Sequence, residues 1–313
     1  MKKFNRSIVI AFSALYSLFF CCGMVAGQVA GQVGQAGQIE PQFKTVTVPG
    51  VLFTAEDRAG YLVSHYWDLF DFRDTTFLQS KTLDRAFVNY VSVLPYATKL
   101  DLNVVLTDLM DRAAVDKAMY VRFLELSKRY LYSPESNFVN EEFFIPILEH
   151  AVKGRLLNST EKINHRYTLG LVKKNRIGTP ASDFSFTLAN GRTSSLYRQE
   201  AETIILMFYN PGCHGCKITI DEIKRSAVIQ NAFRKGTVKI VAVYPDQDLT
   251  EWKKYLNDIP ESWVNGYNKG VHIRENELYD LKAIPMMYLL DKSKKIIMKD
   301  ALVKDIEGYL SRL

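Results

Sequence analysis

The sequence predicts two folded domains, a mostly α-helical one followed by an α/β one with a central mixed sheet flanked by helices. Two observations predict this order. Apolar residues recur at helical spacing through about residues 54–174, where strand-like alternation is scarce. From about residue 177 onward, strand-like runs alternate with helical runs, as in units where crossover helices join strands. With 313 residues, the chain is long enough for two such domains.

The first residues have the layout of an export signal. Three basic residues open the chain, an apolar run from Ile8 to about Cys22 follows, and small residues lie at Val25 to Gly27. We expect residues 1–27 to be a cleaved signal peptide, so that the protein is exported to the periplasm or cell envelope. An uncleaved membrane anchor is an alternative because the apolar run nearly spans a bilayer. Lipidation at Cys21 or Cys22 is another.

The net charge of +6 has a local source. Without the three basic residues of the expected signal, 37 basic and 34 acidic residues remain, which is a balance of +3. No concentrated basic patch is left. This distribution argues against a nucleic-acid partner.

The segment after the signal is rich in Gly and Gln, and we expect residues 28–42 to form a flexible linker. Residues 43–176 are predicted to form the helical domain. Thr54 is the candidate cap of its first helix, with Glu56 and Asp57 in the first turn. Its many aromatic residues are interpreted as packing between helices rather than as a ligand cage. Further helices are expected at 83–94, 102–110, 115–132, 141–152 and 160–171.

Residues 177–313 are predicted to form the α/β domain. Asn190-Gly191 is a strong hairpin signal, and the nearly unbroken apolar run from Thr203 to Tyr209 suits a buried central strand. Strands are expected at 183–188, 203–209, 238–244, 286–290 and 295–299. Helices are expected from the second cysteine to about 233, and at 249–257, 275–281 and 302–313.

The α/β domain contains Cys213 and Cys216, and they are the only cysteines that the mature protein would keep. The loop after a buried strand leads to a helix N-terminus, where a thiolate is stabilised. We expect Cys213 to be the nucleophile and Cys216 to attack the resulting mixed disulfide. His214, when protonated, would stabilise the Cys213 thiolate further. The alternative for His214 is an exposed residue with little effect.

Two structural roles for the pair are less favoured. A zinc site would need two more ligands, and only His272 or carboxylates could supply them. A structural disulfide that closes so short a loop would contribute little stability. The sequence therefore predicts a redox-active disulfide between Cys213 and Cys216, with no other cofactor and no metal.

A family resemblance supports this interpretation. The strand at Thr203 to Tyr209, the sequence Cys213-His214-Gly215-Cys216-Lys217 and a later Ile284-Pro285 before a strand resemble the thioredoxin fold. The likeness covers residues 177–313 and is greatest to the exported TlpA/ResA thiol-disulfide oxidoreductases. It implies that Pro285 is cis, lies beside the cysteines and, with Ile284, binds an incoming cysteine-containing strand. His214 is the third candidate substrate-binding residue.

The chain departs from the pattern of that family at several positions. Met207 stands where thioredoxins usually have a buried acid that helps to deprotonate the second thiol. Asp221 and Glu222 on the next helix are candidate substitutes, although a solvated helix face is the simpler interpretation. Tyr209 stands where tryptophan is common, and Asp221 also replaces a helix-kinking proline.

The predicted function is an exported thiol-disulfide oxidoreductase, favoured as a reductase. Its expected partners are cysteine-containing envelope proteins and a membrane thiol-disulfide electron donor. One alternative is a non-catalytic envelope binding protein on a thioredoxin-like scaffold. Another is a peroxidase of the peroxiredoxin type, although Asn210 stands where those enzymes have Thr or Ser.

Overall fold

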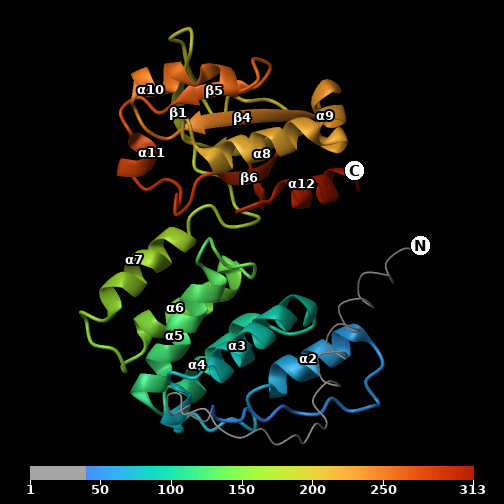
Figure 1. The fold of residues 1–313 in the computed structure, drawn as a ribbon, viewed down its shortest axis with the longest axis vertical. Coiled ribbons are helices and arrows are strands. Elements are labelled where there is room, and N and C mark those ends of the chain that lie inside the picture. The colour runs from blue at the N-terminus through green and yellow to red at the C-terminus, as the bar shows by residue number, and fades with distance from the viewer. Residues whose placement is uncertain (1–39) are drawn as a thin grey trace, which may run out of the picture. The chain divides into compact units, whose positions relative to one another are not determined.

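The computed structural model describes residues 40–313, so the expected signal peptide and residues 28–39 of the expected linker lie outside the described residues. The described chain, drawn in Figure 1, divides into two compact units, and the boundary along the chain lies between Tyr130 and Leu131. The second unit, Leu131–Leu313, begins earlier than the α/β domain expected from the sequence. It includes two helices that the sequence assigned to the helical domain.

The first unit is helical, as expected. Its first helix begins after Thr54, whose Oγ1 accepts a hydrogen bond of 3.0 Å from the N–H of Asp57. Ser80 and Asp101 cap later helices in the same way. The helices are α2 (Ala55–His65), α3 (Lys81–Val93), α4 (Leu102–Ala113) and α5 (Lys117–Leu131), with short 3-10 turns at Thr75–Phe77 and Leu94–Tyr96.

Aromatic side chains fill the core of the first unit. Trp67 is 2% exposed, and its ring lies 5.1 Å from that of Phe123 in an edge-to-face arrangement. The rings of Tyr66, Phe70 and Tyr90 also pack against Trp67. These contacts agree with the interpretation of the aromatic residues as helix packing.

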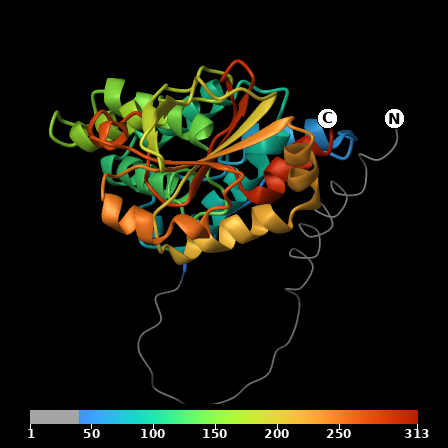
Figure 2. The ribbon, with the colours of Figure 1, turned by 90° about the horizontal axis from the view of Figure 1, so that it is seen from above.

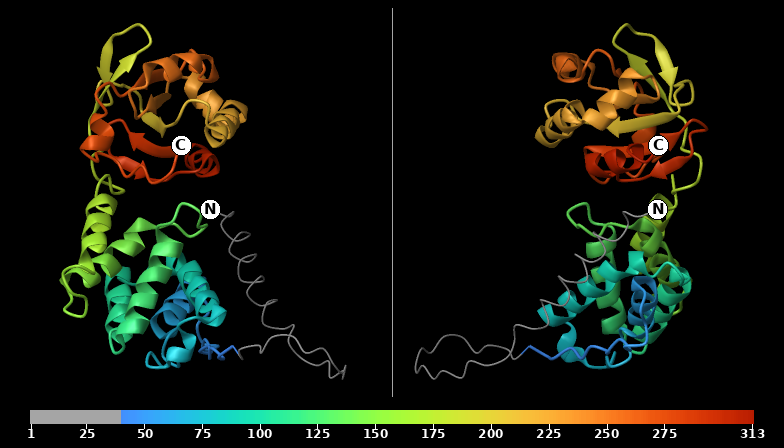
Figure 3. Two further views of the ribbon diagram at one scale, coloured as in Figure 1. Left: turned by 60° about the vertical axis from the view of Figure 1, so that its left-hand side comes forward. Right: turned by 90° about the vertical axis from the view of Figure 1, so that its right-hand side faces the viewer.

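The second unit begins with two helices that pack against each other (Figure 3). A mixed seven-stranded sheet follows, in the order β2-β1-β5-β4-β3-β6-β7. β3 pairs in parallel with β4 and antiparallel with β6. The elements are α6 (Glu141–Lys153), α7 (Lys162–Val172), β1 (Ser185–Leu188), β2 (Thr193–Ser195), β3 (Thr203–Phe208), α8 (His214–Arg225), α9 (Ala227–Arg234), β4 (Val238–Tyr244), α10 (Leu249–Lys254), β5 (Val264–Tyr267), α11 (His272–Glu275), β6 (Met286–Asp291), β7 (Ile296–Met298) and α12 (Val303–Leu310).

The structure differs from the sequence-based expectations for this unit in three places. The helix expected at 275–281 is instead the short α11, because Glu277 takes a left-handed conformation. β5 was not predicted, since its sequence Val-Asn-Gly-Tyr lacks a strand pattern. The single helix expected up to about residue 233 is divided at Ser226, which ends α8 and caps α9.

β3 is buried on both faces and separates two layers of core. Ile205 and Met207 face the layer that α8, α9, α10 and α12 cover, and α8 and α9 run along this face in Figure 2. Ile204, Leu206 and Phe208 face the opposite layer. The carboxyl end of β3 thus delivers the chain to the start of α8. Within residues 40–313, no helix is long and apolar enough to span a membrane.

Candidate active site

Cys213 lies at the end of a tight turn that follows β3. Its N–H donates a hydrogen bond of 3.2 Å to the carbonyl of Asn210. The turn passes through Gly212, whose φ is +67°, and a Cβ there would lie only 3.0 Å from the ring of Tyr255. Glycine is thus required both by the backbone conformation and by the neighbouring ring.

Cys213 is the N-cap residue of α8. The N–H of Cys216 donates to the Cys213 Sγ at 3.3 Å, so the sulfur occupies the place of a capping oxygen. The Cys213 side chain is half-buried and in contact with the core layer beneath α8. A helix N-terminus favours negative charge, and the first cysteine thus lies where the sequence predicted the nucleophile.

Cys216 lies one turn further along α8 and is 2% exposed. It belongs to the same core layer as Met207, Tyr209 and Ile220. Burial, together with a hydrogen bond to Cys213, raises the pKa of the Cys216 thiol to about 12. Both cysteines are free thiols in the structure, and burial keeps the Cys216 thiol protonated at neutral pH.

The Ile284-Pro285 peptide bond is cis, as the resemblance implied. The carbonyl oxygen of Ile284 lies 4.0 Å from the Cys213 Sγ. A Cβ placed on Gly215 would lie 3.5 Å from Cδ of Pro285, so the proline ring borders the C-x-x-C turn. The structure therefore brings Ile284 and Pro285 to the two cysteines.

The other residues singled out from the sequence are more exposed. His214 is exposed at the first position of α8, and its effect on Cys213 stays a prediction. Asp221 pairs at 3.7 Å with Lys224 on the surface of the same helix, and Glu222 is exposed. Neither acid lines the small cavity beside Cys216.

That cavity has a volume of about 10 Å³, enough for about one water molecule. Cys213, Cys216 and Asp258 all line it. Tyr209 lines it as well, and its hydroxyl donates to Asn265 Oδ1 at 2.8 Å and accepts from Trp252 Nε1 at 2.9 Å. Sequence reasoning missed Asp258, because the fold alone brings this acid, which follows α10, to the start of α8.

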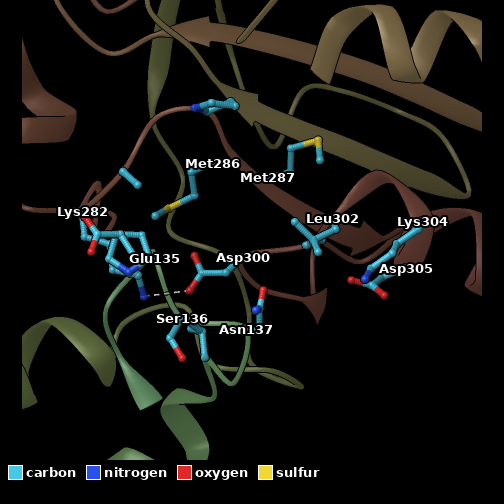
Figure 4. Close-up of a pocket in the computed structure, with 15 residues that line it drawn as sticks. Glu135, Ser136, Asn137, Lys282, Met286, Met287, Asp300, Leu302, Lys304 and Asp305 are labelled. Carbon is cyan, nitrogen blue, oxygen red and sulfur yellow. Dashed lines mark hydrogen bonds and ion pairs between the residues drawn. The ribbon is translucent and has the colours of Figure 1, made fainter. Parts of the chain in front are cut away.

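A larger pocket of about 610 Å³ begins at Pro285, and we call it the cis-proline pocket (Figure 4). Its lining side chains come from three segments, within residues 134–139, 282–287 and 300–305. Figure 4 shows Asn137 on one side and Met286 on the other. No sequence pattern indicated that the segment between α5 and α6 contributes to this pocket.

A buried ion cluster lies at this pocket. Lys282 pairs with Asp300 at 2.8 Å and also with Glu141, and Lys299 pairs with Glu141 at 2.6 Å. The side chains of Glu141, Lys282 and Lys299 are all less than 10% exposed. Burial alone would lower the pKa of Lys282, but the carboxylates of Asp300 and Glu141 outweigh it and raise the pKa, so this lysine stays charged.

The described part of the chain holds no group of three or more His, Cys, Asp or Glu side chains that could bind a metal ion. His272, which the zinc alternative would have needed, lies in α11. That helix packs against the core layer on the other side of the sheet from the cysteines. The arrangement around Cys213 and Cys216 fits thiol chemistry better than metal binding.

Comparison with known proteins gives matches to both parts of the chain. The profile of a thioredoxin-like domain matches residues 201–296, and that of a domain of unknown function, DUF5106, matches residues 23–175. The comparison with curated proteins gave no match.

Solved structures give a match over most of the chain. The crystal structure of a thioredoxin-like protein from Bacteroides caccae is 39% identical, with a TM-score of 0.83 over 86% of this chain and 98% of the other. The C-terminal domain of an uncharacterised protein from Bacteroides fragilis is 44% identical over 44% of this chain and 98% of its own, with a TM-score of 0.43. The first match and the domain profile confirm the predicted thioredoxin-like fold.

Proposed function

Since the chain belongs to the thioredoxin-like proteins that carry a DUF5106 domain ahead of the thioredoxin-like domain, we propose that it exchanges disulfides with other proteins through Cys213 and Cys216. One observation carries this proposal. Cys213 caps α8 beside the cis Ile284-Pro285 bond, while Cys216 is buried one turn further on. A reactive sulfur and a protected resolving sulfur are thus held together.

The reaction has two steps. The Cys213 thiolate attacks a client disulfide, a bond forms between Cys213 and one client sulfur, and the other client sulfur leaves as a thiolate that takes up a proton. Cys216 then loses its proton and attacks Cys213 Sγ. The mixed disulfide breaks, the second client thiol is released, and the Cys213–Cys216 disulfide remains. The client gains two electrons, and the protein loses two.

The proposed direction is reduction of clients. An oxidant such as DsbA owes its potential to a stabilised reduced form, in which thiolate charge is favoured. The resemblance to the exported TlpA/ResA oxidoreductases favours this direction, and the redox titration described below tests it.

The proposed location is the periplasm or cell envelope, on the strength of the charge and apolar pattern of residues 1–27. The clients would be cysteine-containing envelope proteins. Because that compartment is oxidising, the Cys213–Cys216 disulfide needs a source of electrons. A membrane thiol-disulfide relay, whose dithiol becomes a disulfide as it reduces the pair, is the proposed donor.

A trapping experiment tests the exchange. In the Cys216→Ala variant the second step is blocked, and we expect mixed disulfides between Cys213 and client proteins on non-reducing gels. The matched control is the Cys213→Ala/Cys216→Ala double variant, which should trap nothing. Equal trapping by both variants, or normal biological activity of the double variant, would favour a binding protein on a thioredoxin-like scaffold.

A redox titration of the wild-type pair tests the direction. We expect a potential near that of thioredoxin, about −270 mV, and not near that of DsbA, about −120 mV. A value close to the second would overturn the reductase assignment but leave disulfide exchange intact.

A further inference from the structure

The segment between α5 and α6 is fixed to the region just before the cis-proline. At its start, the hydroxyl of Tyr132 donates to Asp280 Oδ2 at 2.8 Å, and the ammonium of Lys282 lies 4.6 Å from the Tyr132 ring centre. At its end, Glu141 pairs with Lys282 and Lys299. Residues 133–140 therefore form a loop that is anchored at both ends.

The loop is also ordered internally. The N–H of Ser136 donates to the carbonyl of Ser133, and the N–H of Phe138 donates to Ser136 Oγ, both at 3.0 Å. The N–H of Asn140 donates to the carbonyl of Leu131 at 2.9 Å. Pro134, Glu135 and Asn137 nevertheless stay exposed, so the loop presents polar side chains to the pocket from a fixed backbone.

The cis-proline pocket lies near the reactive sulfur. Pro285 lines the pocket, and the carbonyl of the preceding Ile284 lies 4.0 Å from the Cys213 Sγ. A second pocket of about 520 Å³, between α8 and α12, shares Met287, Leu302 and Lys304 with the first. The two hollows thus adjoin each other along these residues, and a row of neighbouring hollows suits an extended chain better than a compact small molecule.

The polar groups of the pocket suit a polypeptide. Asp300 Oδ2 is held by Lys282, but Asp300 Oδ1 is buried and accepts no hydrogen bond within the described residues. A buried acceptor without a partner is usually satisfied by a water molecule or a ligand group, and an N–H of a bound chain is such a group. Met286, Met287 and Leu302 supply apolar surface beside it, and methionine adapts to varied side chains.

We propose that the loop at residues 133–140 is a client-binding element that, with the cis-proline pocket, receives the polypeptide segment next to the client's reactive cysteine. The proposal rests on disulfide exchange as the function. It adds that a segment outside the thioredoxin-like sequence match selects the clients. Asn137 lies on the wall opposite Met286 and is the residue best placed to test it (Figure 4).

The test compares two substrates that carry the same chromophoric leaving thiol. One is a peptide whose central cysteine forms the mixed disulfide with that thiol, and the other is N-acetylcysteine amide in the same linkage. We expect Asn137→Trp to lower kcat/KM for the peptide about tenfold and to leave the small substrate within about twofold. The matched control is Asn276→Trp, an equally exposed asparagine after α11, which should change neither.

The outcomes separate this proposal from the function on which it rests. A wild-type protein that reacts with neither substrate would overturn disulfide exchange itself. If the Asn137→Trp variant reacted normally with both substrates, or lost activity equally on both, the client-binding role of the loop would be overturned. Disulfide exchange as the function would stand.

A second measurement locates the peptide directly. The Cys216→Ala variant is trapped with a peptide that carries a photoreactive benzophenone beside its cysteine, and the cross-linked residues are mapped by mass spectrometry. We expect cross-links within residues 133–140 and 300–305. Cross-links confined to the opposite side of the cysteines, near Tyr255, would contradict the proposal.

Discussion

The surroundings of Cys213 and of Cys216 differ although the two residues lie a single helical turn apart. Cys213 is half-buried, caps α8 and borders Ile284 and Pro285, next to a pocket of about 610 Å³. Cys216 is 2% exposed and belongs to a fully packed layer. A cavity of about 10 Å³ lies beside it, and Cys213 lines the same cavity.

This difference suits the two cysteines to different steps of the proposed exchange. In the proposed exchange, Cys213 meets the clients, and it lies at the N-terminus of α8, where backbone N–H groups and the helix dipole favour negative charge. Cys216 resolves the intermediate in the same proposal, and burial both protects it from clients and holds its proton. We therefore expect resolution to be the slower step.

Replacing Met207 with Asp is expected to have the largest effect, because it would change the apolar surroundings of Cys216 most strongly. Met207 is 0% exposed in the layer that contains Cys216. We expect Met207→Asp to lower the free energy of unfolding by about 3–5 kcal/mol, because a carboxylate would be buried without a partner. We also expect faster resolution at neutral pH. Urea unfolding and quenched-flow kinetics would measure the two effects. Met207→Leu, the control, should cost less than about 1.5 kcal/mol.

The packing around Cys216 depends on Tyr209. Its hydroxyl bonds both Asn265 and the indole N–H of Trp252, whose side chain is buried. Tyr209→Phe should lower the free energy of unfolding by about 1–3 kcal/mol, because it leaves that N–H without an acceptor. Tyr255→Phe is the matched control at the same cavity, and we expect a change below about 0.5 kcal/mol. If Tyr255→Phe lowered the free energy of unfolding as much as Tyr209→Phe, the hydrogen bonds of the Tyr209 hydroxyl would contribute no specific stabilisation.

The two steps of exchange should also respond differently to pH. The pKa of the Cys216 thiol is raised to about 12, so its thiolate fraction keeps growing with pH across the neutral and mildly alkaline range. We expect resolution of a preformed mixed disulfide on Cys213 to accelerate at least about tenfold between about pH 7 and pH 9. Stopped-flow release of the client thiol measures this rate. A rate that is flat with pH would mean that Cys216 does not attack as an equilibrating thiolate.

The smallest expected effect concerns Asp258, the acid that lines the cavity beside Cys216. We expect Asp258→Asn to slow resolution several-fold at about pH 7, because a carboxylate there can accept the Cys216 proton through one water. The deficit should shrink as the pH approaches about 9, where deprotonation needs less assistance. Glu261→Gln, an exposed acid nearby in the sequence, is the control and should leave the rate unchanged.

The local patterns of the sequence predicted the elements around the two cysteines. An apolar run followed by two cysteines predicted β3 and the start of α8, because each depends on residues close together in the chain. The cis bond at Ile284-Pro285 was implied by the family resemblance, and the structure has it. β5 escaped prediction because only its neighbours in the sheet make Val-Asn-Gly-Tyr a strand. The same limit applies to Glu141 and Lys282, which are 141 positions apart and meet only through the fold.

The ion cluster at the cis-proline pocket depends on Glu141, which lies in α6 and is far along the chain from the other members of the cluster. Lys282 and Lys299 carry two positive charges, and Asp300 and Glu141 carry two negative ones. A fragment that begins after α7 lacks Glu141 and also Glu135, an acid that lines the same pocket, so the surface beside the cis-proline becomes more positive. We expect such a fragment to bind acidic peptides more strongly than the whole protein does. Substrate preferences measured on it would describe a different electrostatic surface.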